Sequence, residues 1–234
     1  MQRIFLTILL LVPMLMYSQY GDEQLYMAYM SGDLSLWGDY LRNGNWETMD
    51  DAEKTRFINY EYGYIPVEAD KGNPDVRRML DNYKQHIEAH KYILTASQYT
   101  AYKSAACAYE YLLDKHLLFS QGLQSFKLAH KAVELDPQNP LALSLSGNVS
   151  FYAPTLFGGS KKKALQLFEE AERIMEADTA YRYMWNYPAL QLCIAQCYDK
   201  IGDKEKAKRQ YERILAIHPD FDYARKEFVQ KFAQ

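Results

Sequence analysis

The sequence PALQLCIAQCYDKIGDKEKAKRQYERILAIHP, residues 188–219, decides the fold of this chain. Two stretches of helical periodicity meet at Gly202, which can end a helix, and Pro219 cannot continue the second one. Small residues at Ala195 and Ala207 allow two antiparallel helices to approach closely, and aromatic residues fill the groove beside them. The packing positions are Ala195, Tyr198, Gly202, Ala207 and Tyr211. The stretch therefore predicts a pair of packed antiparallel helices.

The same pattern can be followed upstream. Gly147 takes the small position of a second unit, and Ala164 and Phe168 follow in its second helix after a longer loop. Residues 126–137 form the second helix of a third unit and end in KAVELDP. In spacing and residue type, residues 96–219 resemble three tetratricopeptide repeats, with a capping helix after them. The resemblance implies an α-solenoid of stacked helix pairs and says little about function.

Helical periodicity continues through nearly all of the remaining chain, and turn signals separate the helices. We therefore expect an all-α fold, a tetratricopeptide-type solenoid of antiparallel helix pairs with about ten to eleven helices. The expected helices are 22–31, 34–43, 49–65, 74–92, 96–118, 121–135, 139–152, 160–177, 187–201, 204–217 and 220–232. The predicted segments are a signal peptide at 1–19, a helical N-terminal region at 20–95, and repeats with a capping helix at 96–234. The N-terminal region does not match the repeat pattern, and degenerate repeats are the alternative there.

The first residues are typical of an export signal. Arg3 precedes an apolar run over 4–16, and the chain turns polar at 17–19. The run is shorter than the roughly 20 residues of a membrane-spanning helix, and it fits the central region of a secretory signal peptide. We expect cleavage after Ser18 or Gln19, with an uncleaved anchor as the alternative. No cysteine near the cleavage zone could carry a lipid, so the mature protein is predicted to be periplasmic or secreted and not membrane-spanning.

The composition is that of an ordinary globular protein. Of the 234 residues, 48% are apolar and 24% are charged, and the formal net charge is −3. A charge this weak, without a dense basic patch along the chain, argues against nucleic acid or an anionic membrane as partner. The three cysteines, Cys107, Cys193 and Cys197, are too few and too odd in number for a disulfide framework. We expect them to be small buried residues.

A distinctive segment, FYAPTLFGGSKKKA at 151–164, joins the two helices of the middle unit. Its aromatic-Ala-Pro, Phe-Gly-Gly and Lys-x-x-Ala elements resemble the T-component proteins of tripartite periplasmic transporters. Together with the sequence WNY at 185–187, they also resemble secreted tetratricopeptide proteins of the Bacteroidetes type. The chain lacks the lipoprotein cysteine of the T-components.

The corner at 153–160 is predicted to be a built structural element. Pro154 cannot continue a helix, and Gly158 and Gly159 allow backbone shapes that other residues resist. Phe157, together with the preceding leucine, is apolar enough to pack back against the solenoid as a buried peg. The alternative is that Phe157 points outward and the corner belongs to a binding site.

No catalytic constellation can be assembled from this sequence, so we predict a protein that is not an enzyme and has no cofactor or metal. His86 and His90 lie one helical turn apart, a spacing that zinc can use, but no third ligand is apparent. The helix start that follows Gly159 could hold an anion, with a structural corner as the preferred reading. The aromatic residues at 181–187 either hold a local insertion in place or form a platform for a ligand.

Stacked repeats present a concave face, which is formed by the first helix of each pair. We therefore predict an exported binding or scaffold protein that holds a protein or peptide partner on this face. The expected contact residues are Ser144, Asn148, Phe151, Tyr152, Gln196, Asp199 and Lys200. The alternative, implied by the transporter resemblance, is a periplasmic accessory of an uptake system that binds a small molecule between helices near the corner.

Overall fold

The computed structural model describes residues 21–232, and the predicted all-α solenoid is confirmed there. The described residues form 11 α-helices and no β-strand. Within the same range, no helix is both long enough and apolar enough to cross a membrane. The predicted signal peptide at 1–19 lies outside the described residues. The helices are α1 (Asp22–Ser31), α2 (Ser35–Asn43), α3 (Asp51–Asp70), α4 (Val76–Ala89), α5 (Ala96–Leu113), α6 (Gln121–Leu135), α7 (Pro140–Tyr152), α8 (Lys161–Glu176), α9 (Asn186–Ile201), α10 (Lys204–Ile217) and α11 (Asp222–Phe232).

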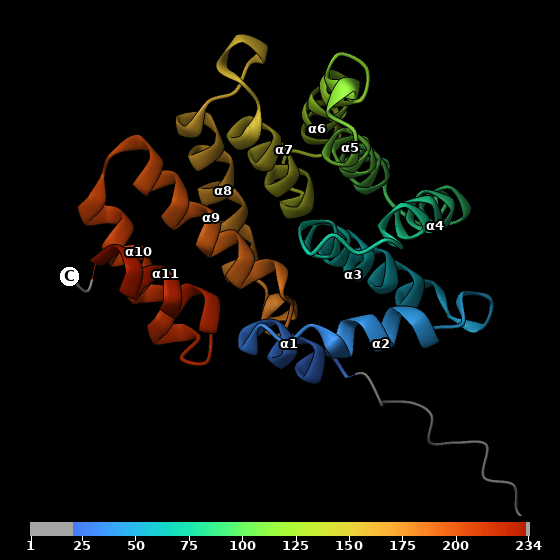
Figure 1. Ribbon diagram of the computed structural model, residues 1–234, viewed down its shortest axis with the longest axis horizontal. Coiled ribbons are helices and arrows are strands. Elements are labelled where there is room, and N and C mark those ends of the chain that lie inside the picture. Colours follow the sequence, from blue (N-terminus) through green and yellow to red (C-terminus); the bar gives the residue numbers. More distant parts are fainter. Residues whose placement is uncertain (1–20, 233–234) are drawn as a thin grey trace, which may run out of the picture.

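The helices form a closed ring, which Figure 1 shows from above. Each helix packs mainly against its neighbours in sequence, as in the pairs α5 with α6, α7 with α8 and α9 with α10. Helix α5 also contacts α3 and α7, so these three helices belong to one inner layer. Short 3₁₀ turns occupy four of the connections: η1 (Trp46–Thr48), η2 (Lys115–Leu118), η3 (Thr155–Phe157) and η4 (Thr179–Tyr181).

Helix ends follow the capping chemistry of the sequence. The side chain of Asn139 accepts hydrogen bonds from the backbone N–H groups at the start of α7, and Pro140 occupies the first turn. The Ser160 hydroxyl accepts from the Lys163 N–H at the start of α8. Gly202, with a φ of 89°, ends α9 in the left-handed region. These residues fix where the helix pairs turn.

The small residues predicted at the helix contacts lie where the helices approach. A Cβ atom on Gly147 would be 2.4 Å from the Phe168 ring, so α7 and α8 meet at a distance that only glycine permits. Ala195 and Ala207, from α9 and α10, are fully buried. The register of the two C-terminal units is therefore the one that the sequence predicts.

Helix α3 is longer than predicted, because it continues through Pro66 instead of ending before it. Proline has no N–H, so the carbonyl of Tyr62, four residues earlier, loses its helical donor. The hydroxyl of Tyr109 in α5 donates to this carbonyl at 2.6 Å. A side chain of the neighbouring helix thus replaces the missing backbone bond and ties α3 to α5.

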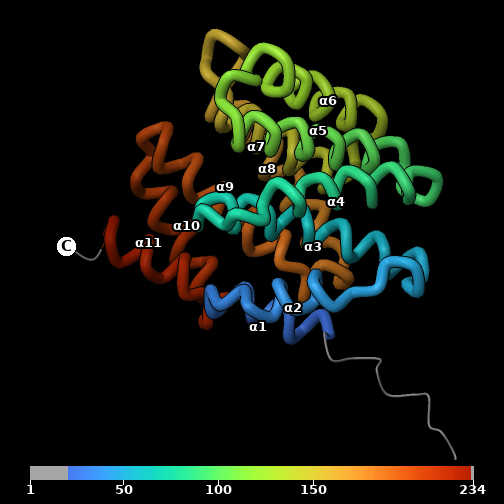
Figure 2. The backbone as a smooth tube through the Cα atoms, turned by 45° about the vertical axis from the view of Figure 1, so that its right-hand side comes forward, coloured from blue at the N-terminus to red at the C-terminus, as the bar shows by residue number. Residues whose placement is uncertain are grey.

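The two ends of the helical array meet and close the ring. Helix α1 packs against α11, and Figure 2 shows the N-terminal helices running beneath the ring beside the C-terminal ones. Tyr26 and Met30 of α1 share an apolar cluster with Tyr211 and Phe221. The N-terminal helices therefore pack as the closing segment of the same ring as the C-terminal helices.

A chain of buried hydrogen bonds crosses this closure. Gln191 Nε2 lies 3.1 Å from the Glu172 carboxylate, to which it donates, and Gln191 Oε1 faces His218 Nε2 at 2.9 Å. An amide oxygen only accepts, so His218 Nε2 carries the hydrogen and Nδ1 is left as an acceptor. The Tyr26 hydroxyl lies 2.6 Å from this Nδ1 and donates to it.

The corner at 153–160 exposes the side chains that the sequence was expected to bury. Leu156 is 87% exposed, and Phe157 is only half-buried, with its ring 5.7 Å from that of exposed Phe119. The expectation that Leu156 packs back against the solenoid is therefore wrong, and Phe157 is buried only in part. The physical reason is the short 3₁₀ turn η3, which lifts these side chains off the helix pair.

Backbone contacts fix the corner instead. Gly158 has a φ of 89°, which other residues rarely adopt. A Cβ atom on Gly159 would lie 1.9 Å from the carbonyl oxygen of Ala153. The N–H of Gly159 also donates to the Pro154 carbonyl at 3.1 Å. The two glycines are thus required for different reasons, one for its φ and one for close approach.

Candidate functional site

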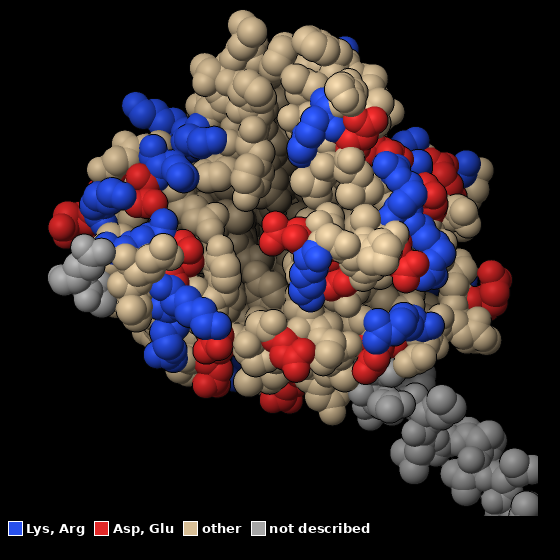
Figure 3. All heavy atoms as spheres, viewed as in Figure 1, with Lys and Arg blue, Asp and Glu red and all other residues tan. Residues whose placement is uncertain are grey.

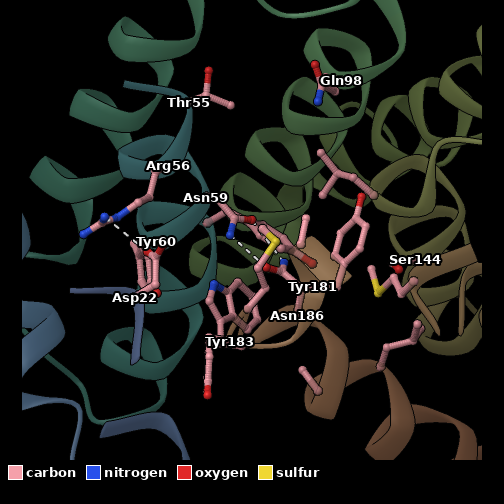
Figure 4. A pocket seen from close by; sticks show the side chains of 18 of the residues that line it. Asp22, Thr55, Arg56, Asn59, Tyr60, Gln98, Ser144, Tyr181, Tyr183 and Asn186 are labelled. Atoms are coloured by element: carbon pink, nitrogen blue, oxygen red, sulfur yellow. Dashed lines mark hydrogen bonds and ion pairs between the residues drawn. The ribbon is translucent and has the colours of Figure 1, made fainter. Parts of the chain in front are cut away.

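A cavity of about 650 Å³ lies inside the ring. Figure 3 shows a hollow between the two halves of the molecule, and Figure 4 shows the cavity wall from close by. The inner helices α3, α5, α7 and α9 and the turn η4 all contribute to the wall. Its aromatic and amide side chains include Asn59, Tyr62, Tyr102, Asn148, Tyr181 and Trp185.

Trp185, directly before α9, is the largest side chain of the wall. A Cβ atom on Gly63 of α3 would lie 2.6 Å from the indole ring, so this glycine makes room for it. The rings of Tyr62 and Trp37 lie 5.6 and 5.4 Å from it. Trp185 is 7% exposed, and its Nε1 has no hydrogen-bond partner among the described residues. A buried N–H without a partner costs about 1–3 kcal/mol.

Amide side chains connect the two halves of the wall. Asn59 of α3 and Asn186 of α9 exchange two hydrogen bonds of 2.8 and 3.1 Å, which are dashed in Figure 4. Asn148 Nδ2 of α7 donates to the Tyr62 hydroxyl at 3.3 Å, and the Cys193 thiol faces the Asn148 oxygen at 3.9 Å. These bonds hold the polar groups in fixed orientations before any ligand arrives.

Charged lining residues gather where α1 and α3 begin. They are Asp22, Asp50, Glu53 and Arg56. Asp50 caps α3 by accepting from the Glu53 N–H at 2.8 Å, and Arg56 forms an ion pair with Asp22 at 3.2 Å. Carboxylates outnumber cations here, so this end of the cavity is acidic while the rest of its wall is uncharged.

The thiol and phenol groups of the wall are neutral at physiological pH. Burial raises the pKa of the Cys193 thiol to about 12. Burial also raises the pKa of the Tyr62 and Tyr102 hydroxyls well above their usual range. No histidine is among the described residues that line the cavity. Away from its acidic end, the wall therefore offers ring stacking and neutral hydrogen bonding.

The contact residues predicted on the middle unit separate in the structure. Ser144 and Asn148 line the cavity. Phe151 is buried in an apolar cluster formed by α7, α8 and α9. Tyr152, the next residue, is 73% exposed and lies outside the cavity lining. Only the first two residues therefore share a surface that could hold a ligand.

The contact residues predicted on the last unit lie away from the cavity. Asp199 forms ion pairs with Lys204 and with Lys231 of α11, so the capping helix engages its carboxylate. Gln196 is half-buried and Lys200 is exposed. Their role toward a partner remains a prediction, because nothing in the structure shows what they bind.

The two histidines with zinc-like spacing have structural contacts. His86 Nδ1 lies 2.9 Å from both carboxylate oxygens of buried Glu61, and its ring stacks on Trp46 at 4.1 Å. His90 Nε2 lies 3.0 Å from the Thr55 hydroxyl. Within residues 21–232, no group of three or more His, Cys, Asp and Glu side chains is arranged to hold a metal ion.

Sequence reasoning missed the contribution of α3 to the cavity. The run NYEYGYIP at 59–66 provides Asn59 and Tyr62 to the wall and Gly63 as the seat of Trp185. The feature of the sequence that could have indicated this wall is the cluster of tyrosines around a glycine in this run. The sequence left two interpretations of the aromatic residues at 181–187, a local anchor or part of a ligand site. Trp185 fits both, because it packs on α3 and also lines the cavity.

Comparison with known proteins identifies one fold relative. No protein-family model and no curated protein sequence matches this chain. Among solved structures, the chain is similar to the HusA haemophore from Porphyromonas gingivalis, with a TM-score of 0.57 and 19% sequence identity. The match covers 78% of this chain and 96% of that chain. At this identity the likeness shows a shared all-α fold.

Proposed function

We propose that this chain is an exported carrier that holds a planar, largely apolar small molecule in its central cavity. The observation that carries the proposal is the cavity itself, whose aromatic wall is uncharged away from its acidic end. Pockets of roughly 300–1,000 Å³ suit small organic ligands, and a few fixed polar groups orient such a ligand. The proposal takes up the small-molecule alternative from the sequence, with the site moved from the corner to the centre of the ring.

Ring closure favours a small ligand over an extended peptide. In an open solenoid the concave face is a long groove that a peptide can follow. Here α1 packs on α11, and the inner face becomes the wall of a cavity of about 650 Å³. Membership of the tetratricopeptide superfamily is part of the proposal, supported by the contact of Gly147 with Phe168 and by the buried Ala195 and Ala207.

A porphyrin is the first ligand class to test. The haemophore with the same fold gives this candidate, and the aromatic wall suits a flat ring system. The lining thiol and phenols stay protonated and no histidine lines the described wall, but Met175 and Met184 line it and a thioether can ligate haem iron. Comparing haemin with the metal-free porphyrin therefore tests whether iron adds to the binding by the ring. The acidic residues near Asp50 and Glu53 should keep the carboxylates of a ligand away from that end.

The test is a titration of purified protein with haemin and, separately, with metal-free protoporphyrin. We expect saturable binding of both, seen as a shift of the porphyrin absorption band and as quenching of tryptophan fluorescence. Ser144→Phe should weaken binding at least tenfold, because a ring added at this lining position occupies the cavity. Tyr152→Ala, which alters an exposed residue of the same helix outside the lining, is the matched control.

The outcome separates the two functional hypotheses. If neither porphyrin binds, the ligand class is wrong. If Ser144→Phe binds as tightly as the unchanged protein, the cavity is not the site. The protein or peptide partner predicted from the sequence would be favoured if Tyr152→Ala abolished capture of such a partner while leaving porphyrin binding unchanged.

A further inference from the structure

One end of the ring carries protruding apolar side chains. Phe119, after η2, is 71% exposed, and Leu156 in η3 is 87% exposed. The ring of Phe119 meets that of Phe157 edge to face at 5.7 Å, so the two segments form one tip although they are far apart in sequence. In Figure 3 the top of the molecule, where this corner lies, is largely uncharged.

Lysines without an ion pair to a described carboxylate lie in the segments before and after this uncharged tip. Residues 115–133 and 137–168, which build η2, most of α6, α7, η3 and the first half of α8, contain no Asp or Glu, although the chain has 30 in total. Most lysines of these two segments form no ion pair with any described carboxylate. These unpaired lysines are Lys115, Lys127, Lys161, Lys162 and Lys163. The weak overall charge hides this asymmetry, because the lysines come from two separate segments that only the fold brings together.

The lysines of the tip differ in how they are held. Lys161 donates to the Phe151 carbonyl, and Lys163 lies 3.1 Å from His130 Nε2. Lys115 and Lys162 are exposed, with Lys115 lying over the Tyr111 ring. Two lysines are thus anchored by polar contacts, and the side chains of the other two are exposed.

We propose that this tip, defined by Phe119, Leu156, Phe157, Lys115 and Lys162, docks the protein on an anionic lipid surface. Apolar side chains that protrude beside lysines are typical of interfacial membrane binding, in which rings and leucines enter the headgroup layer and lysines meet the phosphates. A protein partner would need an extended apolar area on the tip that its own apolar surface could complement. The described tip instead offers single projecting side chains flanked by exposed lysines that form no ion pair, which match a charged lipid surface better. The tip is separate from the cavity, so this inference does not depend on the ligand.

The test is flotation of the full chain with vesicles of phosphatidylcholine alone or with about 30% phosphatidylglycerol. We expect binding to the anionic vesicles, little binding to the neutral ones, and loss of binding at high salt. Lys115→Gln and Lys162→Gln should each weaken binding about 5-fold. Leu156→Ser with Phe119→Ser should weaken it by on the order of tenfold or more.

The matched control is Tyr92→Ser with Ile93→Ser. These residues are also adjacent to a lysine and are 87% and 52% exposed, but they lie in the connection between α4 and α5. The control should bind anionic vesicles like the unchanged protein. Equal binding to neutral and anionic vesicles, equal loss in control and tip variants, or no vesicle binding at all would each overturn the proposal. A dimer that depends on Leu156 and Phe119, without vesicle binding, would show instead that the tip contacts a second copy.

Discussion

Replacing Tyr26 with phenylalanine removes one hydroxyl from the contact that closes the ring. Tyr26 is 8% exposed, and its hydroxyl donates to His218 Nδ1 at 2.6 Å. The phenylalanine ring can keep the apolar packing of the tyrosine, so no cavity forms, but His218 Nδ1 loses its donor inside the protein. Leaving a buried acceptor unsatisfied costs about 1–3 kcal/mol. For a chain of this size each kcal/mol lowers the melting temperature by about 2–4 °C.

The measurement is thermal and urea unfolding of Tyr26→Phe beside Tyr92→Phe. Tyr92 is 87% exposed, so its hydroxyl can be removed without breaking a buried contact. We expect a lower melting temperature only for Tyr26→Phe, together with faster amide hydrogen exchange in α1 than in α5. Equal unfolding midpoints for the two variants would refute the argument that this hydrogen bond holds the ring closed.

Three further predictions test the other contacts that shape the ring. Burial lowers the pKa of His218 from 6.5 to about 4. The unfolded chain therefore binds the proton first, and stability should be complete above about pH 6.5 and fall by about 3 kcal/mol as the pH drops to 4, as urea unfolding at several pH values would show. Tyr109→Phe leaves the Tyr62 carbonyl beside Pro66 without a donor, and calorimetry should show a loss of about 1–3 kcal/mol. Gly159→Ala should lower the free energy of unfolding by more than about 2 kcal/mol. Phe157→Ala truncates a half-buried ring and should lower it by about 1 kcal/mol. The reverse order in urea unfolding would support Phe157 as a buried peg.

Local features of the sequence were sufficient to predict the helices. Most helix boundaries lie within a few residues of the predicted ones, because Asn139, Ser160, Gly202 and similar residues act through contacts one turn away. Two helix ends differ by five residues, since α3 continues to Asp70 and α5 ends at Leu113, before the 3₁₀ turn η2. Pro66 shows the limit of this reasoning. A proline ends a helix only if nothing else satisfies the freed carbonyl, and here Tyr109 of α5 satisfies it.

The cavity residues were only partly predictable. Ser144 and Asn148 followed from the position that a first helix takes in a repeat, and both line the cavity. Their partners in the wall could not follow from that pattern, because Asn59 and Tyr62 belong to a helix without repeat spacing. Asp199 was predicted from the same pattern, and its carboxylate forms an ion pair with Lys231 of the last helix, a contact that the pattern does not indicate.

The sequence by itself determined the secondary structure and the packing of neighbouring helices, because glycine, alanine and aromatic spacing act within one pair. Only the tertiary structure decided that the array closes into a ring. Closure rests on contacts such as Tyr26 with His218 and Asn59 with Asn186, between residues that no periodicity relates. The cavity depends on the same closure, because it turns a row of inner helix faces into a wall around a fixed volume.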